Sequence, residues 1–171
     1  EYEMANIIEI KDIDDLIKTM NLYSNSYVFR GHADSAWKLA TTLERLSSKP
    51  EFPNIFEERS LNEFKAKFHL YDRANITPNS KLEWLSLMQH YGVPTRLLDL
   101  TTSPYVALFF AIEAYDKCIS PDFSVYAFNY TETMKISLQI IKESDKEFNE
   151  TATSIIGRQD EIFEKTIDRF N

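Results

Sequence analysis

Residues 88–111, with the sequence MQHYGVPTRLLDLTTSPYVALFFA, restrict the possible folds of this chain more than any other stretch. Gly92 and Pro94 end the helix before them, because glycine tolerates the left-handed conformation at a helix C-terminus and proline cannot continue a helix. The mixture of polar and apolar residues at 95–100 then suits a short buried strand. We therefore expect a helix end, a turn, a strand and a second helix to follow one another directly.

Hydroxyl side chains gather where this strand should end and the second helix should begin. Thr101, Thr102 and Ser103 follow one another, and Ser103 suits a helix N-cap with Pro104 at the first helical position. Residues 105–115 are apolar nearly all round, which predicts a buried helix. Because a helix N-terminus with hydroxyls beside it can hold an anion or a sugar, we expect a binding site here.

The rest of the chain alternates between helical and strand-like patterns. Helices are predicted over residues 12–23, 54–72 and 81–91, the last with a capping box formed by Ser80 and Glu83. Strands are predicted over residues 27–30, ended by Gly31, and 123–130, with a short β-like run at 154–156. Residues 136–141 and 162–171 fit either a strand or a helix, and the acidic stretch 143–150 suits a loop. These elements indicate one α+β domain over residues 1–171, with a small mixed or antiparallel sheet flanked by helices.

Composition narrows the classes of function. The 171 residues are 43% hydrophobic, with 12 Phe and 9 Tyr, which suffices for one compact domain with a core. A net charge of −8 without a Lys/Arg run argues against non-specific nucleic-acid binding. No segment has the length and apolarity of a membrane span, and the start lacks the layout of a signal peptide. The single cysteine, Cys118, excludes an internal disulfide and favours a reducing, cytoplasmic location, while the start at Glu1 suggests a piece of a larger protein.

Basic side chains at two places are candidates for binding an anion. Arg30 and His32 put one permanent and one titratable positive group at the end of a predicted strand. Alternatively, Arg30 forms a salt bridge with a nearby carboxylate and is purely structural. His90, in the last turn of the helix 81–91, fits a functional role and a simple hydrogen-bonding role equally well. Because His32, His69 and His90 lack metal-ligand spacing with carboxylates, we expect no catalytic metal.

Three motifs resemble one known family. FRGH at Phe29–His32, WKL at Trp37–Leu39 and the long block QHYGVPTRLLDLTTSPYVALFFA from Gln89 are similar to the FRG domain. The resemblance spans residues 27–111. Leu100 stands where the family usually has tryptophan, which changes a packing volume and leaves the polar positions intact.

The order of the motifs is also similar to that of ADP-ribosyltransferases of the Arg-Ser-Glu type. In that order an arginine on an early strand comes first, then a hydroxyl triplet before a helix, then Gln-x-Glu near a third strand. The matching positions are Arg30, Thr101–Ser103, and Gln159 with Glu161, the last two within residues 154–163. The similarity implies an ADP-ribosyltransferase-like fold, NAD as the substrate and an unknown macromolecule as the acceptor, as in a toxin or anti-phage effector.

This similarity also implies a role for each matching residue. Glu161 would stabilise the positive charge that builds up on the ribose as the bond to nicotinamide breaks. Arg30 would hold the pyrophosphate or the ribose by charge-assisted hydrogen bonds, and Thr102 or Ser103 would orient the ribose. The remaining candidates are the residues that would complete a positive pocket or stack on the nicotinamide: His32, His90 and Arg96, and Tyr91, Tyr105 or Phe109.

Two other hypotheses fit the same residues. The domain is a non-catalytic module that uses Arg30, Arg96, His90 and the hydroxyls to bind a phosphorylated ligand or a partner protein. Alternatively, Asp99 pairs with Arg30 or Arg96 and merely holds two strands together. The position of Glu161 relative to Arg30 and Ser103 separates catalysis from binding.

Overall fold

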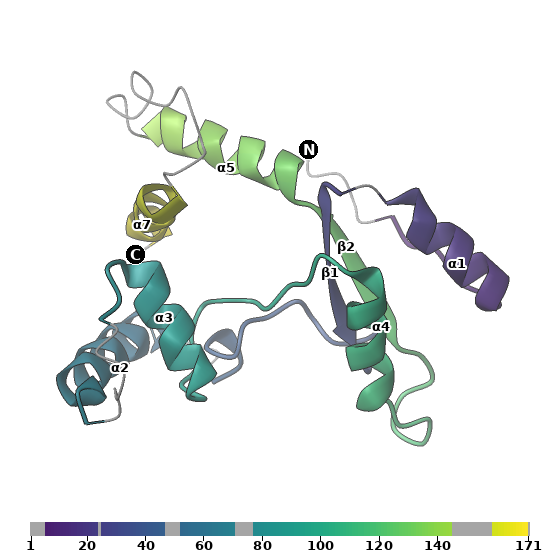
Figure 1. Ribbon diagram of the computed structural model, residues 1–171, viewed down its shortest axis with the longest axis horizontal. Helices are drawn as coiled ribbons and strands as arrows, with labels where there is room; N and C mark the ends of the chain where they lie inside the picture. The colour runs from purple at the N-terminus through teal and green to yellow at the C-terminus, as the bar shows by residue number, and fades with distance from the viewer. Residues whose placement is uncertain (1–5, 24, 47–51, 71–76, 145–158, 171) are drawn as a thin grey trace. The chain divides into compact units, whose positions relative to one another are not determined.

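The computed structural model describes residues 6–23, 25–46, 52–70, 77–144 and 159–170 (Figure 1). The chain divides into two compact units. One comprises Glu1–Ser35 and Leu100–Thr133, and the other comprises Ala36–Asp99 and Met134–Asn171. In the described residues the first unit contains a two-stranded sheet and helices, and the second is helical. The predicted α+β class is confirmed.

The first unit is built on an antiparallel pair of strands, β1 (Tyr27–His32) and β2 (Ser124–Asn129) (Figure 1). A further segment joins the free edge of β1, where Phe29 and Thr101 exchange both backbone hydrogen bonds, at 2.7 and 2.9 Å. Side chains alternate between the two faces of a strand, and residues directly opposite each other share a face. Phe29 and Gly31 therefore face one side of the sheet, and Arg30 and His32 face the other.

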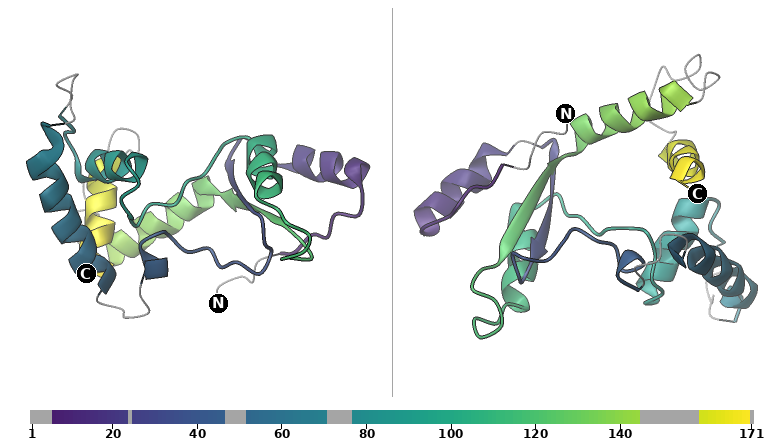
Figure 2. Two further views of the ribbon diagram at one scale, coloured as in Figure 1. Left: turned by 90° about the horizontal axis from the view of Figure 1, so that it is seen from below. Right: turned by 180° about the vertical axis from the view of Figure 1, so that it is seen from behind.

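Helix α4 (Pro104–Glu113) covers the side of the sheet that Gly31 faces (Figure 2). A Cβ atom built on Gly31 would lie 1.9 Å from the carbonyl oxygen of Ala107, so only glycine permits this contact. The prediction that Gly31 ends the strand is therefore wrong, because β1 continues to His32 and uses the glycine for close packing. Ala107 and Ala111 are the buried residues of the helix.

The prediction that this helix is buried all round is wrong. Five of its large apolar side chains are between 42% and 58% exposed: Tyr105, Val106, Phe109, Phe110 and Ile112. A two-stranded sheet offers a narrow surface, so it covers one stripe of α4 and leaves the rest of the helix surface in contact with solvent. The predicted N-cap is confirmed, since the Ser103 hydroxyl accepts a hydrogen bond from the Val106 amide at 3.4 Å.

Helix α1 (Ile13–Leu22) precedes β1 and confirms the predicted first helix. The side chain of Asp12 caps it by accepting a hydrogen bond from the Asp15 amide at 2.8 Å. Met20 is the buried residue of this helix. Tyr23, at the C-terminal end, packs edge-on against the rings of Tyr27 and Phe29, with centroids 4.8 and 5.9 Å away. Local capping thus fixes where the helix begins, and aromatic contacts connect its end to β1.

The second unit is a group of helices around an apolar core. Its elements are η1 (Glu44–Leu46), α2 (Phe52–Phe68), α3 (Lys81–His90), most of α5 (Tyr130–Ser144) and α7 (Gln159–Phe170). Helix α3 contacts both α2 and α7. The buried core comprises Leu61, Phe68, Trp84, Leu85 and Met88. Ser80 caps α3 as predicted, accepting from the Glu83 amide at 3.2 Å.

The prediction of a strand at residues 95–100 is wrong. The backbone amide of Arg96 donates to the buried carboxylate of Glu57, and that of Leu97 donates to the Thr95 hydroxyl. These side chains satisfy the amides that a neighbouring strand would otherwise have taken, so the segment stays irregular. Residues 136–141 are helical within α5, and 162–170 are helical within α7. The β-like run at 154–156 and most of the loop at 143–150 lie outside the described residues.

Candidate functional site

The first cluster of candidate residues lies on the face of β1 that points away from α4. Arg30 and His32 flank Gly31, so their side chains emerge on the opposite side of the sheet from the helix. The Nε–H of Arg30 donates a hydrogen bond to Nε2 of His32 at 3.1 Å. His32 is only 5% exposed, whereas Arg30 is half-buried. The face therefore presents a guanidinium that is held in place by an imidazole.

Aromatic side chains of β2 complete this face. Tyr126 lies directly opposite Arg30, and its ring meets the His32 ring edge-on with centroids 5.0 Å apart. Phe128 stacks on Tyr126 at 6.2 Å with an angle of 14° between the planes. Neither residue was a candidate from the sequence, although the alternation within 123–130 places them on a common face. Such a face can bind a ligand that carries both an anionic group and a flat ring.

The hydroxyl triplet lies beside the same strand. Thr101 pairs with Phe29 through the backbone, and its Oγ1 accepts a hydrogen bond from the Ser103 amide at 3.2 Å. Ser103 uses its own oxygen to cap α4, and Thr102 is exposed. The structure therefore brings Arg30 and the triplet to adjacent segments of one unit.

Gln89, next to the predicted His90, is part of the internal hydrogen-bond network of the second unit. Gln89 accepts from the hydroxyl of the buried Thr95 at 2.5 Å and donates to Asp99 at 2.6 Å. These bonds fix the irregular segment after α3. His90 is the exposed last residue of α3, and its ring contacts that of Tyr91 at 5.5 Å.

Arg96 is held by a buried carboxylate that no sequence motif indicated. Its Nε lies 2.5 Å from Oε2 of Glu57, its backbone amide donates to Oε1, and Nη2 donates to Asn54 at 3.2 Å. Glu57 is 1% exposed. The carboxylate that pairs with Arg96 is therefore on α2, and the salt bridge anchors the segment after α3 to that helix.

The Gln-x-Glu motif lies at the start of α7, in the second unit. Gln159 is the first residue of the helix, and the half-buried Glu161 lies in its first turn. Ile162 is buried against Ile141, with Met134 and Leu138 of α5 packed beside them. The motif therefore belongs to a helix, whereas the resemblance places it near a third strand.

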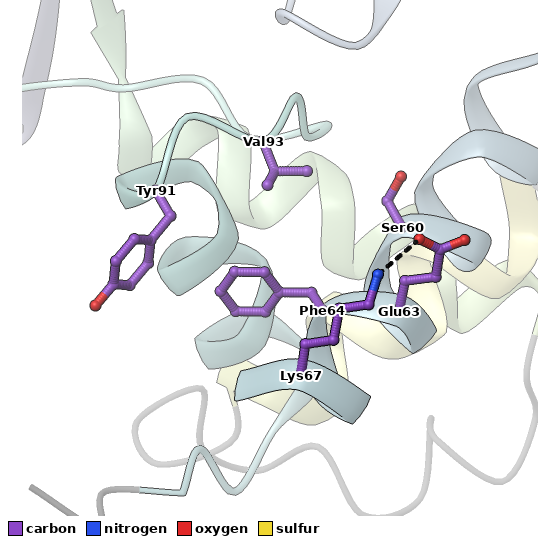
Figure 3. A pocket seen from close by; sticks show the side chains of 6 residues that line it. All are labelled: Ser60, Glu63, Phe64, Lys67, Tyr91 and Val93. Carbon is purple, nitrogen blue, oxygen red and sulfur yellow. Dashed lines mark ion pairs between the residues drawn. The ribbon is translucent and has the colours of Figure 1, made fainter. Parts of the chain in front are cut away.

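An open groove of about 470 Å³ lies between α2 and the end of α3 (Figure 3). Its lining residues are Ser60, Glu63, Phe64, Lys67, Tyr91 and Val93. Tyr91 packs against Phe64 with ring centroids 5.9 Å apart, and Lys67 lies 3.7 Å from Glu63. None of the predicted basic or hydroxyl site residues lines this groove. The groove is therefore lined by other residues than those of the Arg30 face.

Two further structural features limit the possibilities. Among the residues that the structure describes, no three His, Cys, Asp or Glu side chains gather closely enough to hold a metal ion. Within the same residues, every helix is too short or too polar to cross a bilayer.

Comparison with protein families gives one match. The family model described as the FRG domain matches residues 25–118, which is more than half of the chain. The matched range contains β1, the hydroxyl triplet and α4. Neither the curated proteins nor the solved structures contain a match to this chain.

Proposed function

Since the chain belongs to the FRG domain family, we propose that its order of motifs serves an ADP-ribosyltransferase-like enzyme that uses NAD. The observation that carries this proposal is the backbone pairing of Phe29 with Thr101. This pairing sets the hydroxyl triplet beside the strand that bears Arg30. The arrangement agrees with the Arg-Ser part of the Arg-Ser-Glu pattern.

The binding step uses the face of β1 and β2 that carries Arg30. The guanidinium binds the pyrophosphate of NAD, because planar donors match two phosphate oxygens at once. Tyr126 offers a flat ring next to it, suited to a nicotinamide or adenine. The exposed Thr102 hydroxyl is the member of the triplet best suited to the ribose. A local positive group of this kind is needed, since the chain as a whole carries a net charge of −8.

The chemical step breaks the bond between the ribose and nicotinamide. Nicotinamide leaves with the bonding electron pair, and positive charge develops on the ribose. We assign Glu161 as the carboxylate that stabilises this charge. A nucleophilic group on a macromolecular acceptor then forms the new bond to the ribose carbon and loses its proton. Since NAD and a lone exposed thiol, Cys118, both suit a reducing compartment, we place the activity in the cytoplasm.

The test is NAD consumption by the purified chain. We expect NAD to raise the Tm of the wild-type chain and nicotinamide to be released. Arg30→Ala should weaken NAD binding about 100-fold, because charge-assisted hydrogen bonds are lost. Glu161→Ala should slow nicotinamide release by about 100-fold or more while binding persists. Exposed residues of the same types, changed in Arg59→Ala and Glu164→Ala, serve as matched controls. Unchanged nicotinamide release in Glu161→Ala would remove that residue from the mechanism.

A non-catalytic binding module is the second candidate. The observation that favours it is the position of Glu161 in the first turn of a helix whose next residue, Ile162, is buried in an apolar cluster. In that case NAD or another phosphorylated ligand binds in an Arg30-dependent manner without release of nicotinamide. The two measurements above, binding and product release, therefore decide between the candidates.

A further inference from the structure

Helix α4 has an apolar surface on the side that points away from the sheet. Ala107 and Ala111 are its buried residues, and its extensive contacts are with β1 and β2. Tyr105, Phe109 and Ile112 follow one another at spacings of four and three residues, so they form one stripe along the helix. At about 100° per residue, this stripe lies on the far side of the helix from the two alanines.

The exposed apolar surface of α4 is large for a surface in contact with water. We call it the α4 face, and it comprises Tyr105, Val106, Phe109, Phe110 and Ile112. Each side chain is between 42% and 58% exposed. The three rings, of about 200 Å² each, expose about 350 Å², and the two aliphatic side chains bring the α4 face to about 500 Å². Apolar patches of more than about 300 Å² on a protein surface are often sites of association. The α4 face is therefore an interaction surface.

The charges of α4 indicate which partner fits this face. Glu113 is the only charged residue of the helix, and it is exposed at the last helical position. A carboxylate is unfavourable at the C-terminus of its own helix, because the macrodipole is negative there. In an antiparallel pair of α4 helices, each Glu113 would lie beside the N-terminus of the other helix, where the macrodipole favours a carboxylate. The helix is thus complementary to a second, antiparallel copy of itself.

Lipid headgroups and nucleic acids fit the α4 face less well. Helix α4 contains no Lys or Arg that could contact a phosphate, and the chain has a net charge of −8. That net charge also makes two copies of the chain repel each other. A surface with one charge in ten residues is where two such copies can approach most closely.

We propose that the α4 face is the interface of a homodimer in which two α4 helices pack antiparallel about a two-fold axis. Phe109, near the middle of the helix, then lies close to that axis. The two faces together bury about 1,000 Å², which is the low end of the range for specific interfaces. Arg30 emerges on the opposite side of the sheet, so this inference is independent of the proposed function.

Sedimentation equilibrium of the full chain tests the interface. We expect the wild type to dimerise with a Kd of about 10 μM, as suits an interface of this size. Phe109→Glu should weaken the dimer by about 100-fold or more, because two like charges would meet near the axis. Phe109→Ala, which adds no charge, should weaken it by about tenfold and serves as a second variant if Phe109→Glu does not fold. Ile13→Glu puts the same charge on α1 at a side chain that is 73% exposed, and should leave the Kd unchanged.

Glu113→Gln tests the antiparallel arrangement. It should weaken the dimer by about threefold to tenfold, because each copy loses a favourable interaction with the helix N-terminus of the other. In a parallel pair the two Glu113 carboxylates would repel each other, so the same substitution would strengthen the dimer. A wild-type chain that stays monomeric at about 200 μM, or a dimer that persists unchanged in both Phe109 variants, overturns the inference. A tighter dimer in Glu113→Gln overturns the antiparallel arrangement.

Discussion

Replacing Gly31 with alanine tests the packing of β1 against α4. The added Cβ would lie 1.9 Å from the Ala107 oxygen and 2.8 Å from the Ala111 nitrogen. Both are backbone atoms, so no flexible side chain can yield. To restore an ordinary contact of 3.4 Å, α4 would have to move about 1.5 Å away from the strand. The burial of Ala107 and Ala111, now 1% and 0% exposed, would then be lost.

Overpacking of this severity should destabilise the first unit by about 3 kcal/mol, the upper part of the usual range for such changes. The second unit contains both tryptophans, Trp37 and Trp84, so tryptophan fluorescence would miss the effect. Amide hydrogen exchange, measured for individual peptides, reports the loss of stability in the first unit itself. We expect exchange in peptides from β1 and α4 to accelerate about 100-fold.

Gly92→Ala provides the matched control. Gly92 has a φ of 79° and no atom within 4 Å of a built Cβ, so alanine there suffers backbone strain without a clash. We expect a cost of about 1 kcal/mol, limited to the second unit. If Gly31→Ala leaves exchange in β1 and α4 unchanged, or costs less than Gly92→Ala, the reasoning about this contact is refuted.

Substitutions at three further positions have defined outcomes. Glu57→Gln leaves Arg96 without its carboxylate, so the free energy of unfolding measured in urea should fall by about 3 kcal/mol. An unchanged urea midpoint would contradict the anchoring role of the salt bridge. Thr95→Val removes the hydroxyl that donates to Gln89, so the free energy of unfolding in the same assay should fall by about 1 to 3 kcal/mol. An unchanged free energy of unfolding would contradict the role of this hydrogen bond. Ser103→Ala removes the N-cap of α4, so the free energy of unfolding should fall by about 1 kcal/mol. Ser103→Asp should keep the cap and the stability, and equal stability of the two variants would contradict the capping role.

The sequence predicts best those features that depend on residues close together in the chain. The predicted caps at Ser80 and Ser103 each join a side chain to an amide three residues away, and both are confirmed. The strand predicted at 95–100 is wrong because Glu57, distant in the sequence, takes the amide of Arg96. The strand propensity of residues 95–100 contains no information on a hydrogen bond to a residue so distant in the sequence.

The candidate site was predictable to the same extent. The motif order put Arg30 and the hydroxyl triplet together, and the structure pairs their segments. The position of Tyr126 opposite Arg30 depends on the register between β1 and β2, which the pattern of residues within each strand does not determine. The exposure of α4 likewise depends on how few strands lie beneath it, because an apolar sequence alone cannot reveal the size of the surface that receives it.

Strand β1 meets α4 through the bare backbone of one residue and presents a guanidinium from the residue just before it. If Arg30 binds an anion as proposed, ligand recognition and the rigidity of the first unit depend on the same short stretch of chain. A substitution that relaxes the helix contact would then also shift Arg30, so variants selected for altered ligand preference should rarely arise at β1 without a loss of thermal stability. Adaptation to new ligands is then more readily accommodated on β2 and in the loops, where side chains can change while the strand beneath the helix stays as it is.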